Sequence, residues 1–161
     1  PGDTVEIVVD ADGVVRTESV VLGARPDDAE SGYLGVTPAE EPDVPFTVTF
    51  NLADVGGPSA GLMFSLAVVD KLSPGELSNG DFVAGTGTID SAGTVGPIGG
   101  IPYKLIAARE AGATTFLVPS QNCSEAVQNA QDGLRLVRVD SLDSAIDSLE
   151  AIGAGQSPPT C

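Results

Sequence analysis

The pattern of apolar and polar residues separates a short N-terminal stretch from the rest of the chain. Residues 4–9 and 14–22 are rich in valine and isoleucine, and the segment between them, Asp10-Ala11-Asp12-Gly13, has the composition of a turn. This pattern predicts a β-hairpin. Residues 23–45 contain several acidic residues and prolines and show little periodicity, which predicts a connector that crosses the surface.

From residue 46 onward, strand-like and helix-like segments alternate, which is typical of a mixed α/β fold (α/β or α+β). Strands are expected at 46–50, 82–89, 94–95, 115–118 and 134–139, with a turn at 90–93. Helices are expected at 59–72, 102–111, 124–130 and 141–152. Pro58 and Pro102 suit the first turns of two of these helices, and Asp140 is expected to cap the last one.

Composition narrows the classes of function. The 161 residues include 7 Lys+Arg and 23 Asp+Glu, which gives a formal net charge of −16. Such a chain has no basic stripe with which to neutralise a phosphate backbone or an anionic membrane surface, so no nucleic-acid partner is expected. Because 42% of the residues are hydrophobic, the chain can still form a real core.

The chain contains no histidine, and this excludes several kinds of catalytic site. Ser-His-Asp and Cys-His nucleophile pairs and His-ligated zinc all require an imidazole, and no metal site is expected. A general base would have to be a carboxylate or a lysine. Lysine occurs only as Lys71 and Lys104.

The two cysteines, Cys123 and Cys161, are too few for a metal knuckle and are not spaced as a redox motif. They form either a disulfide or two free thiols, with Cys123 then acting as a small buried hydrophobe. A disulfide would close a loop of about 38 residues, worth roughly 3.9 kcal/mol in the chain-entropy model. It would also hold the proline-rich terminal segment and indicate an oxidising compartment.

The sequence of Gly57-Pro58-Ser59-Ala60-Gly61 matches G-x-S-x-G, a pattern that places a serine at the start of a helix. Small neighbours such as Gly57, Pro58 and Ala60 would let a substrate backbone approach, and the helix start offers N–H groups for an oxyanion. The alternative is a serine that merely begins a tightly packed helix. The motif alone does not decide between these two interpretations.

Lys104 is the more informative of the two lysines. Lys71 falls in the last turn of a predicted helix, where a cation suits the helix dipole. Lys104 falls in the first turn of the predicted helix at 102–111, among apolar neighbours, where the dipole and burial both favour the neutral amine. A neutral lysine can accept a proton from a serine. In the alternative interpretation, the stem of Lys104 covers apolar surface and its amine reaches solvent.

Four segments in a fixed order resemble the proteolytic domain of Lon proteases. They are Gly57-Pro58-Ser59-Ala60-Gly61-Leu62, Gly85-Thr86-Gly87-Thr88-Ile89, residues 95–108, and Ala111-Gly112-Ala113 through Val118-Pro119 to Asn122. The resemblance covers residues 46–150, and it implies a mixed sheet with flanking helices. It assigns the roles of a Ser-Lys catalytic dyad to Ser59 and Lys104, and a role in supporting the lysine to Thr86.

The resemblance also implies a serine endopeptidase that acts on extended or unfolded polypeptide segments and needs no cofactor. No P-loop sequence occurs, so ATP independence is expected. ATP-dependent members carry an acidic residue close before the serine motif, and the nearest carboxylate here is Asp54. The competing hypothesis is a non-catalytic peptide-binding module with the same fold.

The local sequence Val55-Gly56-Gly57-Pro58-Ser59 and the positions of the two cysteines resemble those of secreted bacterial proteases that join a PDZ domain to a Lon-like domain. This resemblance implies three parts: residues 1–24 as the end of a PDZ domain, 25–45 as a linker, and 46–161 as the proteolytic domain. It further implies an extracytoplasmic protein in the cell envelope. The full-length chain would carry the rest of the PDZ domain and an N-terminal membrane anchor, and a homo-oligomer is compatible with this interpretation.

Overall fold

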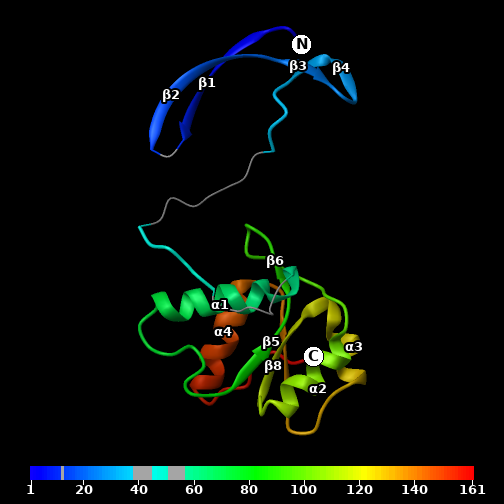
Figure 1. Cartoon of the computed structure of the whole chain (residues 1–161). Coiled ribbons are helices and arrows are strands. Elements are labelled where there is room, and N and C mark those ends of the chain that lie inside the picture. The colour runs from blue at the N-terminus through cyan, green and yellow to red at the C-terminus, as the bar shows by residue number, and fades with distance from the viewer. Residues whose placement is uncertain (12, 38–44, 51–56) are drawn as a thin grey trace. The chain divides into compact units, whose positions relative to one another are not determined.

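The computed structural model describes residues 1–11, 13–37, 45–50 and 57–161, which fall into two compact units, Pro1–Thr47 and Val48–Cys161 (Figure 1). In the first unit, β1 (Thr4–Ala11) pairs antiparallel with β2 (Val14–Val21), which confirms the predicted hairpin. Of the described residues, none forms a helix long and apolar enough to cross a bilayer.

A second hairpin lies in the segment expected to be a connector. β3 (Gly23–Arg25) pairs antiparallel with β4 (Asp28–Tyr33), and the Asp28 carboxylate accepts hydrogen bonds from the Glu30 N–H and the Ser31 hydroxyl. These strands are polar and mostly exposed, so they lack the apolar alternation by which strands are recognised in a sequence. Part of the expected linker, residues 38–44, lies outside the described residues.

The second unit is built on a parallel sheet with the strand order β5 (Val83–Gly85), β8 (Thr115–Pro119), β9 (Arg135–Val139). Two pairs of helices pack on it (Figure 1). α1 (Gly61–Leu72) and α4 (Leu142–Gly153) contact each other, as do α2 (Ile101–Glu110) and α3 (Cys123–Gln128). The mixed α/β architecture expected from the sequence is confirmed.

The central strand β8 separates two hydrophobic cores. Leu117 belongs to the cluster that includes α1 and α4, whereas Phe116 and Val118 belong to the cluster that includes α2 and α3. Alternate side chains of a strand point to opposite faces of the sheet, so each helix pair covers one face. All five residues of β8 are buried, as is usual for a parallel strand covered on both faces.

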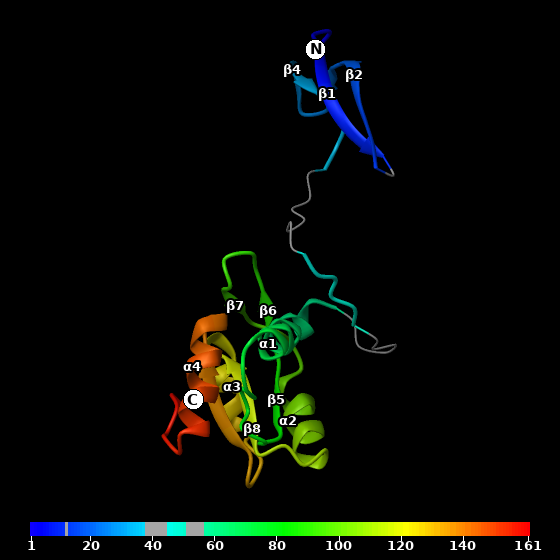
Figure 2. The ribbon, with the colours of Figure 1, turned by 90° about the vertical axis from the view of Figure 1, so that its left-hand side faces the viewer.

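The strand expected over 82–89 is interrupted. β5 ends at Gly85, and β6 (Thr88–Ile89) then pairs with β7 (Val95–Gly96) in a small antiparallel hairpin. The Asp90 carboxylate accepts hydrogen bonds from the Ala92 and Thr94 N–H groups and so forms the turn. Figure 2 shows this hairpin extending beyond the end of the helices.

Two further predictions are wrong. Residues 46–50 are irregular, because an isolated apolar alternation cannot form a strand without a partner, and no described strand pairs with them. Instead, the Phe50 ring stacks on Phe64 of α1, with ring centroids 4.4 Å apart. The cap of α4 is Ser141 and not Asp140, because the Ser141 and Ser144 side chains form a reciprocal capping box.

The C-terminal segment lies along β9. Val137 forms a β-bridge with Thr160, and the Arg138 N–H donates to the Pro159 carbonyl. Cys161 forms a disulfide with Cys123 at the start of α3, with the two Cα atoms 5.0 Å apart. The predicted cysteine pairing is confirmed, and the terminal segment is held both by backbone hydrogen bonds and by a covalent bond.

Candidate active site

Ser59 lies in η1, a single 3-10 turn (Pro58–Ala60) that leads directly into α1. The preceding residue, Gly57, has a φ of 85°, a backbone conformation that side-chain-bearing residues rarely adopt. Ser59 and Ala60 are half-buried, whereas Gly57 and Pro58 are exposed. Ser59 therefore lies on a tight turn and is partly accessible to solvent.

The backbone carbonyl of Ser59 accepts two hydrogen bonds from the interruption between β5 and β6. The Thr86 hydroxyl donates to it at 2.9 Å, and the Gly87 N–H donates to it at 3.0 Å. In return, the Leu62 N–H donates to the Gly87 carbonyl at 3.1 Å. The first turn of α1 is thereby fixed to the end of the parallel sheet.

The small size of Gly61 allows this close approach. A Cβ at Gly61 would lie 3.0 Å from Cγ2 of Ile89 and 3.3 Å from the Ile89 nitrogen. Both distances are shorter than ordinary van der Waals contact. The second glycine of the G-x-S-x-G motif thus allows the helix start to pack against β6.

Thr86 is almost completely buried, at 1% exposure. Its N–H donates to the Leu117 carbonyl of β8 at 3.2 Å, so the residue connects the sheet to Ser59. Because the hydroxyl hydrogen is directed to the Ser59 carbonyl, the hydroxyl oxygen keeps lone pairs that can accept from another donor. The expected role of Thr86 in supporting Lys104 stays a prediction.

Lys104 is in the first turn of α2, and its N–H donates to the Gly100 carbonyl at 3.3 Å. The side chain is half-buried, between the fully buried Ile101 and Leu105 on the same helix. Tyr103 beside it is 79% exposed. Lys104 thus lies at the border between the core side of α2 and solvent.

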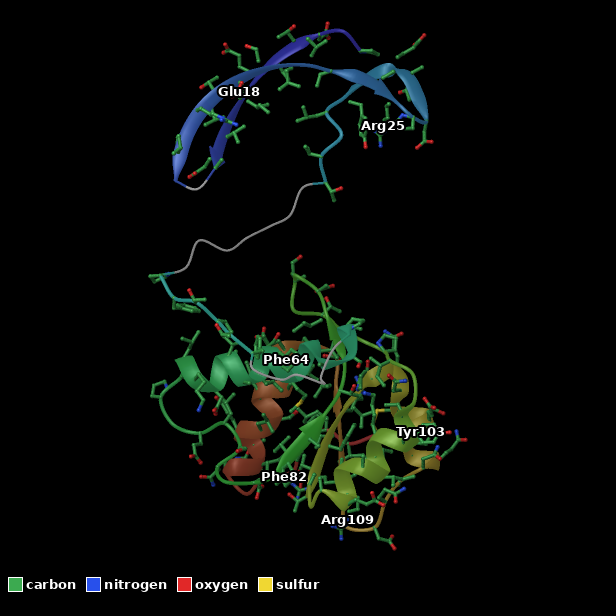
Figure 3. All side chains as sticks on the ribbon, viewed as in Figure 1. Glu18, Arg25, Phe64, Phe82, Tyr103 and Arg109 are labelled. Carbon is green, nitrogen blue, oxygen red and sulfur yellow. A yellow bond between two sulfur atoms is a disulfide. The ribbon has the colours of Figure 1, made fainter. Side chains whose placement is uncertain are left out.

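The topology brings the starts of α1 and α2 to the same edge of the sheet. Ser59 is hydrogen-bonded to Thr86, which follows the carboxyl end of β5. Asn122 follows the carboxyl end of β8 and is hydrogen-bonded to Ile98, which precedes α2. In Figure 3, α2 runs from Tyr103 near this edge to Arg109 at the far end of the unit. Ligands of open α/β sheets bind outside the carboxyl ends of the strands.

The structure brings Ser59 into contact with Thr86 and places Lys104 at the same edge of the sheet. Among the described residues, no hydrogen bond joins the Ser59 hydroxyl to the Lys104 amine. Bonds between catalytic groups are often long without substrate and shorten in the complex. Asp54, noted as the nearest carboxylate, lies outside the described residues, as do Val55 and Gly56.

Two other features are separate from this site. A hollow of about 260 Å³ lies between α1, α4 and β5, and neither Ser59 nor Lys104 lines it. Hydrogen bonds from Thr94 hold the pKa of Asp90 below its ordinary value, and those from Ser31 and Glu30 do so for the pKa of Asp28. Within the described ranges, no three potential metal-binding side chains cluster.

Two features of the site were not predicted from the sequence: the position of Gly87 and the contact between Asn122 and Ile98. Gly87 is buried, and a Cβ there would lie 2.8 Å from Cγ1 of Val95. The signal available in the sequence was a glycine inside an apolar, strand-like run, which often marks a close backbone approach. No sequence pattern pointed to the partner of Asn122.

Comparisons with known proteins agree with this architecture. Residues 48–151 match the model of the Lon protease (S16) C-terminal proteolytic domain. A Lon protease of Methylocella silvestris is 33% identical over 152 residues, which are 91% of this chain and 18% of that protein. A Lon protease of Haemophilus influenzae is 32% identical over 139 residues, which are 83% of this chain and 17% of that protein.

A Lon protease of Heliobacterium modesticaldum is 39% identical over 93 residues, which are 56% of this chain and 11% of that protein. The chain thus spans less than a fifth of the length of these relatives. The matched residues include the whole parallel sheet and the starts of both α1 and α2. The chain belongs to the Lon protease (S16) C-terminal proteolytic domain family.

Proposed function

We propose that this chain is a serine endopeptidase in which Ser59 is the nucleophile and Lys104 is the general base. The observation that carries the proposal is the pair of hydrogen bonds from Thr86 and Gly87 to the Ser59 carbonyl. These bonds hold the serine at the sheet edge where α2, with Lys104 in its first turn, begins. Membership of a family of proteolytic domains supports the same reaction class.

In the proposed reaction, the Ser59 Oγ attacks the carbonyl carbon of a peptide bond while the Lys104 amine accepts the hydroxyl proton. Backbone N–H groups near Ser59 stabilise the oxyanion of the tetrahedral intermediate; the Leu62 N–H is not one of them, since it is bonded to the Gly87 carbonyl. When the intermediate collapses, the C–N bond breaks and the proton passes from Lys104 to the leaving amine. Lys104 then activates a water molecule, which hydrolyses the acyl-enzyme and releases Ser59.

The proposed substrates are extended or unfolded polypeptide segments. The exposed Gly57 and Pro58 and the half-buried Ala60 offer little steric hindrance to a peptide backbone, and pairing through main-chain hydrogen bonds favours extended substrates. We propose that this reaction needs no ATP, since none of its steps consumes a nucleotide. No cofactor takes part in the steps above.

We propose an extracytoplasmic location for the protein. The disulfide between Cys123 and Cys161 supports it, because structural disulfides persist in oxidising compartments. The proposal extends to a longer chain that carries a PDZ domain, an N-terminal membrane anchor and a capacity to form homo-oligomers. The first hairpin, β1 with β2, would then be part of that PDZ domain.

The test is cleavage of an unstructured protein such as reduced casein, without ATP, by the wild type and by Ser59→Ala, Lys104→Ala and Lys71→Ala. We expect cleavage by the wild type and Lys71→Ala and a loss of at least 100-fold in the other two variants. Cleavage by Ser59→Ala at the wild-type rate would contradict the proposal. Binding of the unfolded protein without cleavage by any variant would favour the non-catalytic binding module.

A further inference from the structure

Asn122 makes a two-point contact with the backbone of a distant loop. Its Oδ1 accepts the Ile98 N–H at 2.9 Å, and its Nδ2 donates to the Ile98 carbonyl at 3.0 Å. Asn122 is 7% exposed, so solvent has little access to this pair of bonds. A buried side chain that satisfies both polar groups of one residue restrains the position and the orientation of that backbone.

The restrained loop leads directly into the helix that carries Lys104. Ile98 is followed by two glycines, and Gly100 adopts a left-handed conformation with a φ of 76°. Glycines impose few backbone restraints of their own, so the path of this loop depends on contacts from outside it. The Lys104 N–H then donates to the Gly100 carbonyl. The backbone from Ile98 to Lys104 is therefore anchored on Asn122 at one end.

Asn122 is itself held firmly. It is the last residue of η2 (Ser120–Asn122), which follows the buried strand β8, and it directly precedes Cys123. The disulfide joins Cys123 to Cys161, whose N–H donates to the Leu136 carbonyl of β9. The anchor of the loop is thus fixed to two strands of the central sheet.

We infer that Asn122 is a positioning residue for Lys104: through its two bonds to Ile98, it sets where the first turn of α2 presents the lysine relative to Ser59. This inference rests on the proposed function of Lys104 as general base. Loss of the side-chain amide would leave both polar groups of Ile98 without these partners and free the glycine-containing loop. Proton transfer from Ser59 would slow, whereas substrate contacts at residues 57–60 would be unaffected.

The experiment compares Asn122→Ala with Asn129→Ala in the full chain. Asn122 directly precedes α3, and Asn129 directly follows it. The Asn129 Nδ2 donates to the Glu125 carbonyl at 2.8 Å. The control therefore also removes a hydrogen bond from an asparagine side chain to the backbone, but it leaves the contact with Ile98 intact. We expect Asn122→Ala to lower kcat by 10- to 100-fold with KM within twofold of wild type. Asn129→Ala should retain both constants.

A second readout does not depend on activity. With lysine labelled at 13Cε, the protein shows only the signals of Lys71 and Lys104, since these are its only lysines. We expect the Lys104 signal to move in Asn122→Ala and to stay in Asn129→Ala, and the Lys71 signal to stay in both. Asn122→Asp keeps an oxygen that can accept from the Ile98 N–H but loses the donor to the Ile98 carbonyl. This variant should move the Lys104 signal less than Asn122→Ala does, and it provides the same test if Asn122→Ala fails to fold.

An unchanged kcat and an unchanged Lys104 signal in both Asn122 variants would overturn the inference. Equal losses in Asn122→Ala and Asn129→Ala, with the two lysine signals moving together, would also overturn it, because they would indicate a general loss of stability. If the wild type cleaves no substrate, the proposed function fails, and the Lys104 signal alone then decides whether Asn122 positions that side chain.

Discussion

The buried hydroxyl of Thr86 donates a hydrogen bond to the backbone carbonyl of Ser59 at 2.9 Å. The two residues are 27 positions apart in the sequence, and the bond joins the start of α1 to the carboxyl end of β5. Because Thr86 is also bonded to β8 through its N–H, Ser59 is held relative to the central strand of the sheet. The position of the proposed nucleophile is therefore a property of the core and not of the turn alone.

Replacement of Thr86 by valine keeps the shape of the side chain and removes the donor. We expect Thr86→Val to lose about 1–2 kcal/mol of stability, since a neutral hydrogen bond contributes about 1 kcal/mol and an unpaired buried acceptor costs more. The Gly87 N–H still donates a hydrogen bond to the Ser59 carbonyl, so the protein should fold. Peptidase activity should fall at least 10-fold. Urea unfolding and casein cleavage measure the two effects.

Thr86→Ser is the matched control because it keeps the hydroxyl and loses only a methyl group. It should retain most of the activity. Activity of Thr86→Val equal to that of the wild type would show that the bond to Ser59 does not matter for catalysis.

Replacement of Gly61 by alanine has two opposite effects on stability: a higher helix propensity and a steric clash with Ile89. Alanine favours a helix over glycine by about 1 kcal/mol, but its Cβ would lie 3.0 Å from Cγ2 of Ile89. We expect Gly61→Ala to give no gain in thermal stability and to lower activity, because η1 must move away from β6. The double variant Gly61→Ala/Ile89→Ala, which removes that Cγ2, should recover part of the activity. Wild-type activity in Gly61→Ala alone would show that the close packing of Gly61 against Ile89 does not matter for catalysis.

The disulfide between Cys123 and Cys161 closes a loop with a sequence separation of 38 residues. Its removal by Cys161→Ser or by reduction should cost up to about 3.9 kcal/mol in the chain-entropy model. The thermal midpoint should then fall on the order of 10 °C. Calorimetry with and without reductant measures this shift. Thiol titration of the denatured, unreduced protein should find no free thiol, and two reactive thiols would contradict the pairing.

The pKa of Asp90 is lowered because its carboxylate accepts hydrogen bonds, chiefly from the Thr94 N–H. A carboxylate with a lowered pKa in the folded state stabilises the protein above its unfolded pKa of about 3.9, and this contribution is lost as the pH falls through the folded pKa. We therefore expect Asp90→Ala to be less stable than the wild type at pH 6. The difference should shrink at about pH 3. Urea midpoints that differ equally at both pH values would contradict this account.

The sequence predicted the elements whose signals are local. The 3-10 turn that leads into α1 begins at Pro58, and α2 begins one residue before Pro102, as proline at a helix start predicts. The buried strand β8 and the first hairpin appear where apolar runs and turn residues indicated them. These elements depend on patterns that lie within a few residues of one another.

Features that depend on distant partners could not be predicted from sequence patterns. The apolar alternation at 46–50 has no described partner strand and is irregular. The interruption after Gly85 exists because Thr86 and Gly87 bond to Ser59, a contact that no local pattern reveals. The family resemblance named Ser59, Lys104 and Thr86, but the bond from Asn122 to Ile98 emerged only from the structure.

The most direct test of the proposed dyad is the rate at which a fluorophosphonate modifies Ser59, followed by mass spectrometry of the intact protein and its peptides. Lys104→Arg keeps the positive charge but removes a base that can accept a proton, and Lys71→Arg is the matched control. We predict a single adduct on Ser59 in the wild type and in Lys71→Arg, and modification at least 100-fold slower in Lys104→Arg. Equal rates of Ser59 modification in Lys104→Arg and the wild type would contradict the assignment of Lys104 as the base that activates Ser59.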